Sequence, residues 1–436
     1  MDSNKTQRLL DKWKHSDKKK SLQASISKAP SGVTVPLTSG QQRLWFLQRL
    51  LPENPVYNYS ESFLLAGKLN QSAFAHSVKQ VFEDNSILRS TYPYKDDMPV
   101  QVINDGLEVP LNRIDLSHES SADREKQKGE ALMADALRPF NLDEFPLVRT
   151  TLIKLSETEH VFLMTMHHII FDKWSMDLFL KALGNEYRAF VLNETTIKEE
   201  NDLQFADYAF WQRGKVLDAA KVDYWKKKLG GEIPTLDLPT DYPQPPRPSY
   251  KGTSYRSQFS EDLSKRVLDL SKNLETTPYV LLLSVYYLLL HKYSGQKDIL
   301  VGSPISHRIN KALENIIGFF DETIVLRTTV IPENTFADFV KKVRETTLEA
   351  FANKDVPFEV LVKELSPQRS LSANPFFRVM FIYHSVQKSP SFGSGLELSH
   401  SFFNPGVSKF DLTLYVANED GKLSSGFEYA SDIFKE

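Results

Sequence analysis

The residues with the clearest chemical potential lie within ten positions of one another, in the run Met166-His167-His168-Ile169-Ile170-Phe171-Asp172-Lys173-Trp174-Ser175. A neutral imidazole has an unperturbed pKa of about 6.5, so it can accept a proton or a hydrogen bond near neutral pH without large tuning. Successive residues on a strand point to opposite faces, so His167 and His168 should not address the same atom. We therefore expect one histidine to pack in the interior and the other to face a cleft.

The spacing of this run leaves several interpretations open. Asp172 follows His168 by four residues, which suits a carboxylate that fixes the geometry of a base and equally suits a buried pair that ties a strand to a helix. A zinc site is disfavoured, because the run lacks the two helical histidines of HExxH. A triad of Ser175, His168 and Asp172 lacks a G-x-S-x-G elbow, so Ser175 is more typical of a helix cap. We expect no metal site.

Two elements must position these residues. His160-Val-Phe-Leu-Met-Thr-Met166 is a near-continuous apolar run, which predicts a strand buried on both faces. From Trp174 to Phe190 the apolar residues recur with a period of about 3.6, which predicts a helix. A strand-to-helix junction of this kind is a common ligand site in α/β proteins.

Helices and strands alternate along the rest of the chain. Helices are expected at about 39–51 (capped by Thr38 or Ser39), 74–82, 126–137, 262–273, 277–293, 335–352 and 357–365. Strands are expected at 60–65, 100–103, 147–154, 252–259, 298–303, 323–330, 376–384, 410–417 and 422–429. A proline-rich stretch, 239–248, predicts a surface crossover near a boundary between two halves. The pattern indicates an α/β (α+β sandwich) architecture built twice.

Composition excludes several classes of protein. The 436 residues contain 53 Lys and Arg against 56 Asp and Glu, for a formal net charge of −3, which argues against nucleic-acid binding by bulk charge. The absence of cysteine excludes disulfides and thiolate chemistry and suits a cytoplasmic protein. The longest apolar run, Tyr279–Leu290, is too short to cross a bilayer, so no membrane association is expected. Residues 1–34 form a basic leader, which predicts a linker or docking segment.

The histidine run resembles the HHxxxDG(W)S signature of condensation domains in nonribosomal peptide synthetases, which belong to the chloramphenicol-acetyltransferase-like superfamily. Further stretches resemble family motifs in the same order: Thr38-Ser-Gly-Gln-Gln-Arg-Leu-Trp-Phe-Leu47, Ile87-Leu-Arg-Ser90, Phe205-Ala-Asp-Tyr-Ala-Phe-Trp-Gln212, Ile317-Gly-Phe-Phe-Asp-Glu-Thr323 with Leu326-Arg327, Asp355-Val-Pro-Phe-Glu-Val-Leu-Val362 and Asn374-Pro-Phe-Phe-Arg-Val-Met-Phe381. The resemblance covers about residues 37–434.

This resemblance implies a pseudo-dimer of two acetyltransferase-like subdomains, arranged as a V around a central tunnel. They would comprise residues 35–205, which carry the histidine motif, and 206–436, expected to be truncated before a last helix. His168 would be catalytic and His167 would accompany it. Asp172 would be structural and would pair with Arg89 of the Ile87–Ser90 stretch. Lys173, Trp174 and Ser175 would lie along the tunnel.

The implied activity is an amide-forming acyl transfer in antibiotic biosynthesis. It would join a donor acyl or peptidyl thioester to the amine of an aminoacyl acceptor, both carried on 4'-phosphopantetheine of peptidyl carrier proteins, beside an adenylation domain of the same synthetase. The domain itself would bind no cofactor and would be a monomer. Gln41-Gln-Arg-Leu-Trp-Phe-Leu47 resembles domains that take an L-configured donor. The alternatives are an impaired carrier-recruiting module and an acyltransferase that uses soluble acyl-CoA.

Two departures from the family pattern bear on these expectations. Lys173 replaces the glycine that normally follows the motif aspartate, and its side chain would narrow the tunnel, reorganise the loop, bind a substrate carboxylate or extend to solvent. Asp321-Glu322 replaces the usual Val-Asn pair and adds negative charge.

Overall fold

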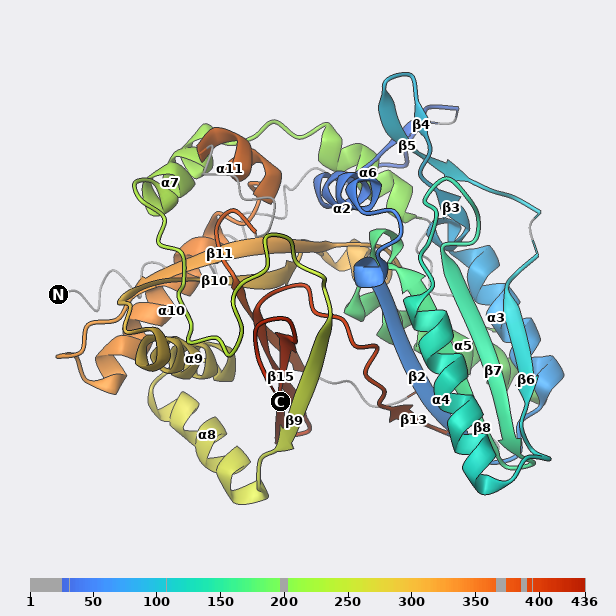
Figure 1. The fold of residues 1–436 in the computed structure, drawn as a ribbon. Coiled ribbons are helices and arrows are strands. Elements are labelled where there is room, and N and C mark those ends of the chain that lie inside the picture. The colour runs from blue at the N-terminus through green and yellow to red at the C-terminus, as the bar shows by residue number, and fades with distance from the viewer. Residues whose placement is uncertain are drawn as a thin grey trace.

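The computed structural model describes residues 26–30, 32–106, 108–196, 203–365, 374–385, 390–393 and 395–435. Two bodies, each with a sheet flanked by helices, lie side by side (Figure 1). This arrangement agrees with the predicted repetition of a mixed sheet-and-helix unit. Most of the predicted basic leader, residues 1–25 and 31, lies outside the described residues.

The first body contains a five-stranded sheet in the order β13-β2-β8-β7-β6. Its strands are β2 (Asn58–Ala66), β6 (Leu111–Asp115), β7 (Val148–Ser156), β8 (Glu159–His167) and β13 (Glu397–Ser401). The helices α3 (Gln71–Asp84) and α5 (Lys173–Leu192) cover one face, and α4 (Ser121–Leu137) covers the other (Figure 1).

Strand β8 is buried on both faces, as its apolar run predicts. Phe162 and Met164 pack in the large core cluster with α3 and α5, whereas Val161 and Leu163 pack in a smaller cluster with α4. The side chains of a strand alternate between faces, so an uninterrupted apolar run is needed when helices lie on both sides.

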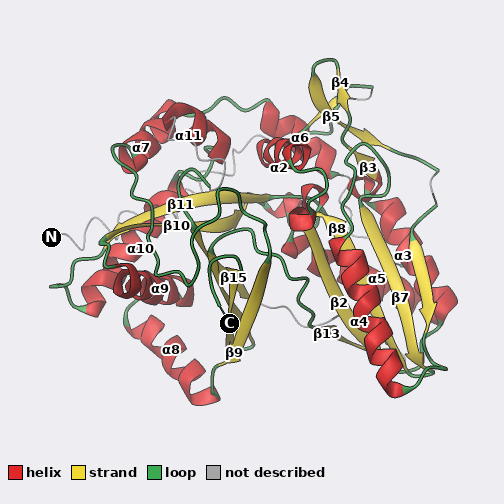
Figure 2. Ribbon diagram, in the orientation of Figure 1, coloured by secondary structure: helices red, strands yellow, loops and turns green. Residues whose placement is uncertain are grey.

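The second body contains a six-stranded sheet in the order β11-β10-β12-β14-β15-β9. Its strands are β9 (Gly252–Gln258), β10 (Asp298–Ser306), β11 (Asp321–Thr329), β12 (Val379–Ser385), β14 (Leu412–Glu419) and β15 (Lys422–Ala430). Its helices are α7 (Ala219–Leu229), α8 (Glu261–Asn273), α9 (Pro278–Ser294), α10 (Phe336–Ala352) and α11 (Phe358–Leu365), seen with the strands in Figure 2. Trp225, Tyr286, Tyr287, Phe339 and Phe381 fill the core of this body.

Two helices lie where the bodies meet, and a small sheet lies beside them on the side of the first body (Figure 1). The sheet contains β1 (Val35–Pro36), β3 (Ser90–Thr91), β4 (Tyr94–Lys95) and β5 (Met98–Ile103), and the helices are α2 (Ser39–Leu50) and α6 (Phe205–Arg213). Thr38 caps α2: its hydroxyl accepts from the Gln41 backbone N–H, and the Gln41 side chain accepts from the Thr38 N–H. This reciprocal capping satisfies two donors that the first turn leaves free.

The second half of the chain also contributes to the first body. Strand β13 pairs antiparallel with β2, with Leu398 opposite Leu65. Ile317 and Phe319, from the segment before β11, belong to the core cluster of the first body. Phe205 in α6 belongs to the same cluster, so the helix that begins at the predicted boundary packs with the N-terminal half. The division at residues 205 and 206 itself stays a prediction.

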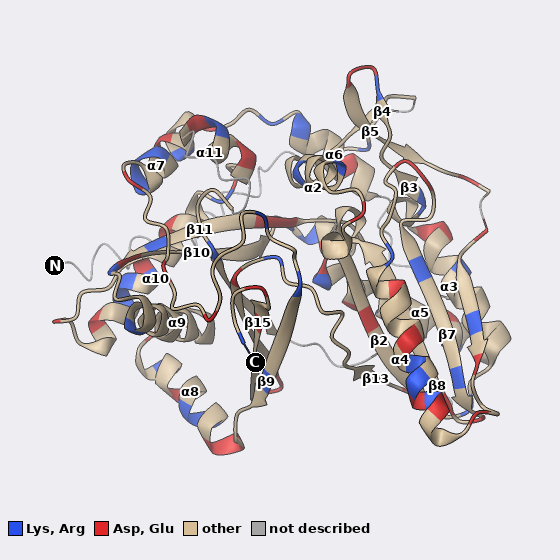
Figure 3. Ribbon diagram, in the orientation of Figure 1, with Lys and Arg blue, Asp and Glu red and all other residues tan. Residues whose placement is uncertain are grey.

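Charged residues of both signs are interspersed along the helices, for example on α4 (Figure 3). On that helix Lys126 pairs with Glu130 and Lys128 pairs with Glu125. Such surface pairs contribute little individually to stability. None of the helices in the described part of the chain is long and apolar enough to span a bilayer.

Candidate active site

The histidine run lies at the junction between β8 and α5. Strand β8 ends at His167, a short 3-10 turn (His168–Ile170) follows, and Asp172 caps α5. The Asp172 Oδ1 atom accepts from the Ser175 backbone N–H at 2.7 Å. An aspartate at this position accepts a hydrogen bond from a free N–H of the first helical turn. This capping contact fixes how the histidine run leads into α5.

His167 is the histidine that packs inside. Its side chain has no exposed surface. Its Nδ1 atom accepts from the Ile169 N–H at 3.1 Å, and its Nε2 atom lies 3.2 Å from Gln48 Oε1, an amide oxygen that can only accept. The proton is therefore on Nε2. Burial, with smaller contributions from His168 and Lys409, lowers the pKa of His167 to about 3, so this imidazole is neutral and positions the turn.

His168 has the opposite tautomer. Its Nδ1 atom lies 2.7 Å from the Phe171 carbonyl oxygen. Because a carbonyl can only accept, Nδ1 carries the proton and Nε2 presents its lone pair. The ring is held by stacking on Tyr59, at 5.9 Å between centroids and 20° between planes, and by the edge of Phe319 at 5.0 Å. Within the described residues no side chain or backbone group hydrogen-bonds Nε2, which leaves this atom available to a substrate.

The surroundings keep His168 neutral. Burial and the positive charges of Lys409 and Arg43 together lower its pKa to about 3, although the Phe171 carbonyl acts in the opposite direction. At neutral pH the imidazole is therefore a hydrogen-bond acceptor at Nε2. It would hold a full proton only weakly.

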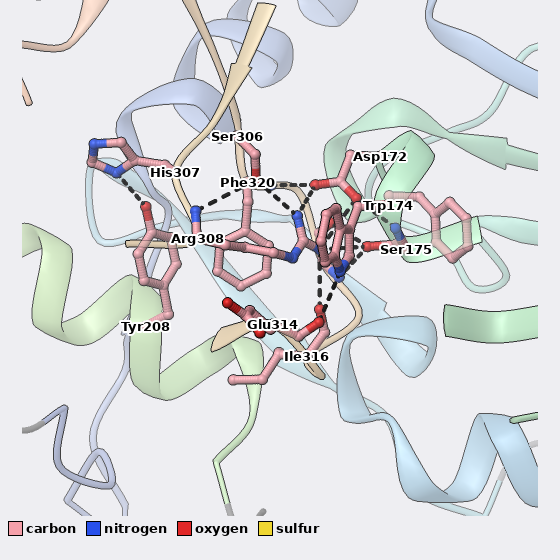
Figure 4. Close-up of polar contacts among 12 residues, drawn as sticks. Asp172, Trp174, Ser175, Tyr208, Ser306, His307, Arg308, Glu314, Ile316 and Phe320 are labelled. Carbon is pink, nitrogen blue, oxygen red and sulfur yellow. Dashed lines mark hydrogen bonds and ion pairs between the residues drawn. The ribbon is translucent and has the colours of Figure 1, made fainter. Parts of the chain in front are cut away.

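Asp172 is fully buried and forms an ion pair with Arg308 (Figure 4). The two guanidinium nitrogens lie 2.7 and 3.2 Å from the carboxylate oxygens, and the Phe320 N–H donates to Oδ2 at 3.0 Å. The Arg308 guanidinium carbon also lies 4.1 Å from the centroid of the Phe320 ring. A charge-assisted bidentate pair of this geometry fixes the start of α5 to the segment that precedes β11.

The predicted pairing of Asp172 with Arg89 is wrong. The Arg89 guanidinium forms an ion pair with Asp105 and donates to the carbonyls of Phe82 and Asn104. These contacts hold Arg89 within its own local loop. The Asp172 carboxylate instead faces the second half of the chain, where Arg308 follows the end of β10. Asp172 thus forms a structural ion pair as predicted, but with a different arginine.

Ser175 and Trp174 extend this connection (Figure 4). The Ser175 hydroxyl donates to the Gly318 carbonyl at 2.8 Å and accepts from the Gly318 N–H at 2.9 Å and from Arg308 at 3.0 Å. The Trp174 indole N–H donates to the Glu314 carbonyl at 2.8 Å. A Ser175–His168–Asp172 triad is therefore not formed, because the serine and aspartate are both engaged with the 306–320 segment.

Gly318 is required by this packing. A Cβ atom at this position would lie 2.0 Å from the Phe205 ring. Because such an approach is far closer than van der Waals contact, only glycine lets the chain pass between Phe205 and Ser175.

Comparison with known proteins identifies the family. The family model described as "Condensation domain" matches residues 32–436. The chain belongs to the condensation domain family. It is 41% identical over 408 residues to a linear gramicidin synthase of Brevibacillus parabrevis, covering 92% of this chain and 8% of that protein. It is 34% identical over 420 residues to Surfactin synthase subunit 1 of Bacillus subtilis (strain 168), covering 96% and 11%. The condensation domain thus spans about a tenth of these synthetase proteins.

Solved structures show the same fold. The X-domain from teicoplanin biosynthesis superposes with a TM-score of 0.83 at 25% identity, covering 94% of this chain and 93% of that chain. The first condensation domain of the calcium-dependent antibiotic synthetase superposes with a TM-score of 0.77 at 19% identity, covering 93% of each chain. The prediction of a nonribosomal peptide synthetase condensation domain with an acetyltransferase-like α/β fold is confirmed.

Lys173 is the first departure of this condensation domain from the family pattern. It occupies the first position of α5, and its ammonium forms an ion pair with Asp177, one turn further along, at 2.7 Å. Burial would lower the pKa of Lys173, but the charges of Glu61 and Asp177 outweigh it and raise the pKa. The lysine is therefore charged and neutralised by neighbours. Asp172 still caps α5, and the Phe171 carbonyl still fixes the His168 tautomer.

The second departure, Asp321-Glu322, lies at the start of β11. Burial raises the pKa of both carboxyl groups; the charge of Asp172 adds to the shift of Asp321, and that of Glu359 adds to the shift of Glu322. Arg43 acts in the opposite direction and lies 3.5 Å from Glu359. This acidic group is thus held between α2, β11 and α11.

Three site residues, Arg308, Tyr59 and Gln48, were not predicted from the sequence. Arg308 follows β10 by two positions, and the only indication of its role was that a basic residue follows a buried strand. Tyr59 and Gln48 carry no motif of their own, although Gln48 directly follows the Thr38–Leu47 stretch. In the described residues no group of three or more His, Asp or Glu side chains has the geometry to hold a metal ion.

Proposed function

We propose that this condensation domain forms an amide bond between a donor acyl or peptidyl thioester and the amine of an acceptor aminoacyl thioester. The observation that carries this proposal is the free Nε2 atom of His168, whose tautomer is set by the 2.7 Å hydrogen bond from Nδ1 to the Phe171 carbonyl. An unprotonated nitrogen of this kind suits an amine N–H as its partner.

The reaction needs no covalent enzyme intermediate. The amine nitrogen bonds to the thioester carbonyl carbon, and the carbonyl electron pair moves to oxygen. Collapse of the tetrahedral intermediate restores the carbonyl and breaks the carbon–sulfur bond, and the proton lost by nitrogen ends on the departing sulfur. An α-amino group has a pKa of about 7.7–8.0, so much of it is already a free base near pH 8.

The low pKa of His168 assigns it a positioning role toward the amine. An imidazole with a pKa of about 3 gives little driving force for full proton removal, but its Nε2 lone pair can hold and orient an amine N–H. Most of the rate would then come from holding two tethered substrates in register, which contributes up to about 7–11 kcal/mol in well-oriented reactions.

The substrates are proposed to arrive on the 4'-phosphopantetheine arms of an upstream donor carrier and a downstream acceptor carrier, through the tunnel that the family resemblance predicts. An adjoining adenylation domain of the same synthetase would load the acceptor, the donor would be L-configured, and the setting would be cytoplasmic. The similarity to gramicidin and surfactin synthases supports this assignment.

The test is intact-protein mass spectrometry of an aminoacyl acceptor carrier mixed with an acyl or peptidyl donor carrier and this protein. We expect the acceptor carrier to gain the mass of the donor acyl group with wild-type protein, and the gain to fall by at least about 100-fold with His168→Ala. His168→Gln, whose amide oxygen can accept a hydrogen bond, is the matched variant. No product across a broad donor panel, or equal product with His168→Ala, contradicts the proposal.

A second candidate is a module that recruits a partner protein. The teicoplanin X-domain, which resembles this chain, has also been solved in a complex with OxyB. The same assay separates the two functions, because a recruiting module yields no donor-plus-acceptor mass with either the wild-type protein or the histidine variants. Donation from free acyl-CoA at the rate of a carrier-bound donor would instead favour an acyltransferase that uses soluble thioesters.

A further inference from the structure

Lys409 enters the site from the second half of the chain. It lies on the loop between β13 and β14, and the backbone beside it is tightly fixed. The Ser408 N–H donates to the Tyr250 carbonyl at 2.9 Å, and the Ser408 hydroxyl donates to the Phe410 carbonyl at 2.7 Å. A Cβ atom on Gly252 would lie 2.4 Å from Ser408 Cβ, so this loop packs directly against β9.

The Lys409 side chain reaches across to the first body. Its ammonium lies 5.6 Å from the centroid of the Tyr57 ring, and that ring lies 6.3 Å from the His167 ring. The positive charge of Lys409 lowers the pKa of both His167 and His168, and for His168 only burial has a larger effect. The ammonium therefore approaches the histidine pair on the side of the Tyr57 ring.

The Lys409 ammonium has no carboxylate within ion-pair distance among the described residues. Burial lowers the pKa of Lys409; the charges of Glu428 on β15 and Asp321 on β11 act to raise it, and that of Arg43 on α2 acts to lower it. An ammonium has three donors, and a partly buried cation without an anion is costly to maintain. Such a group is expected where negative charge arrives with the substrate.

In the proposed reaction, negative charge first develops on the thioester carbonyl oxygen. Attack of the amine converts this oxygen to an oxyanion, and collapse of the intermediate returns its electron pair to the carbonyl. A fixed cation that faces this oxygen stabilises the transition state more than the ground state. His168 holds the amine side of the same reaction, so the oxyanion must form within a few ångströms of Nε2.

We propose that Lys409 is a catalytic residue, whose ammonium donates a hydrogen bond to the oxyanion formed from the donor thioester. This inference rests on the proposed condensation function. It assigns the amine to His168 of the first body and the carbonyl oxygen to Lys409 of the second body. Both bodies would then contribute a group to the reacting atoms.

The test is steady-state kinetics of the carrier condensation reaction with Lys409→Met and Lys409→Arg. We expect Lys409→Met to lower kcat about 100-fold, as does loss of an oxyanion donor elsewhere, with KM for either carrier changed by less than about threefold. Lys409→Arg keeps the charge and should recover kcat to within about tenfold of wild type. Lys251→Met, an exposed lysine bridged to Val407 in the same loop region, is the control that should retain wild-type kcat.

Three results would overturn the inference: a Lys409→Met kcat within about threefold of wild type, a loss confined to KM, or no difference between Lys409→Arg and Lys409→Met. Thermal unfolding of each variant checks folding. If Lys409→Met does not fold, Lys409→Gln replaces it, and Lys409→Arg must then exceed Lys409→Gln in kcat. A wild-type protein that forms no product refutes the proposed function, whereas an active wild type with an equally active Lys409→Met refutes only this inference.

Discussion

At the scale of single residues, the two adjacent histidines have different chemistry because their neighbours fix opposite tautomers. Gln48 accepts from Nε2 of His167, and the Phe171 carbonyl accepts from Nδ1 of His168. The sequence predicted that one would pack and the other would face a cleft, since strand neighbours diverge. It did not indicate the tautomers, because both depend on where Gln48 and the Phe171 carbonyl lie after folding.

The buried pair Asp172–Arg308 is expected to be the most sensitive ion pair of the site. Asp172→Asn or Arg308→Met alone should lower the free energy of unfolding by about 3–5 kcal/mol, because either leaves a buried charge without its partner. The double variant should lose clearly less than the sum of the two. Chemical denaturation of the four proteins measures this cycle.

Asp105→Asn is the matched control for that cycle. Its carboxylate pairs with Arg89, the partner that the sequence had suggested for Asp172, but its side chain is 86% exposed. The loss should stay within about 1 kcal/mol. The assignment of Asp172–Arg308 as the sensitive ion pair would be refuted if the stability losses of the two single variants were additive. It would also be refuted if Asp105→Asn lost as much stability as either of them.

The partner of Asp172 was not predictable from spacing, because Arg308 lies 136 positions away in the chain. The family motif contains the aspartate but gives no position for its arginine, and Arg89 was chosen from another motif. Ser175 was correctly predicted to lie near the start of a helix, but its predicted role as the cap is wrong, because Asp172 caps α5. Its bonds to Gly318 depend on contact between the two bodies, which no local pattern encodes.

At the scale of elements, strong periodicity predicted most of the long helices and strands, but α6, α7 and β6 were not predicted. β8 and α5 were placed within three residues of their observed ends, because one is an uninterrupted apolar run and the other has a clear 3.6-residue period. Strand β13 was not predicted. Its five residues, Glu397-Leu-Ser-His-Ser401, expose most of their side chains, so only Leu398 carries the pattern of a strand.

Helix α5 gives a prediction for Lys173. Lys173→Gly should leave turnover within about threefold of wild type, because the Lys173 ammonium pairs with Asp177 along its own helix and the His168 geometry does not depend on it. The helix should lose at most about 1 kcal/mol, since glycine is a poor helix former. The rate of carrier condensation and the thermal midpoint measure the two effects.

Lys173→Met separates charge from length in the same experiment. Methionine is similar in length to lysine but cannot form the ion pair, and this variant should also retain turnover. A rise in turnover of more than about tenfold with glycine, but not with methionine, would show instead that the lysine obstructs the path of a substrate.

At the scale of the whole molecule, the two bodies are joined through shared structure. β13 adds a strand from the second half to the first sheet, Ile317 and Phe319 enter the first core, and the Asp172–Arg308 pair spans the boundary. The sequence predicted two similar units but not these contributions of the second half of the chain to the first body. The two units depend on each other through contacts between residues more than a hundred positions apart in the chain.

This sharing predicts a single cooperative unfolding transition. Far-UV circular dichroism and tryptophan fluorescence should give coincident denaturation curves, because the core of the first body is incomplete without residues from the second half of the chain. Gly67→Ala, at the turn after β2, would place a Cβ atom 2.3 Å from the Gly395 carbonyl oxygen and should shift the whole curve to lower denaturant. Two separated transitions in either protein would show that the bodies fold independently.

In the proposed mechanism, a neutral His168 orients the free amine of the acceptor through Nε2. The most direct test is the single-turnover rate of carrier condensation between about pH 5.5 and 9. Because the pKa of His168 is about 3, the imidazole remains neutral across this range. The rate should rise with pH through one ionisation near the amine pKa of about 7.7–8.0 and then level off. An added inflection near pH 6.5 that disappears in His168→Gln would contradict the claim and show that His168 titrates as a conventional general base.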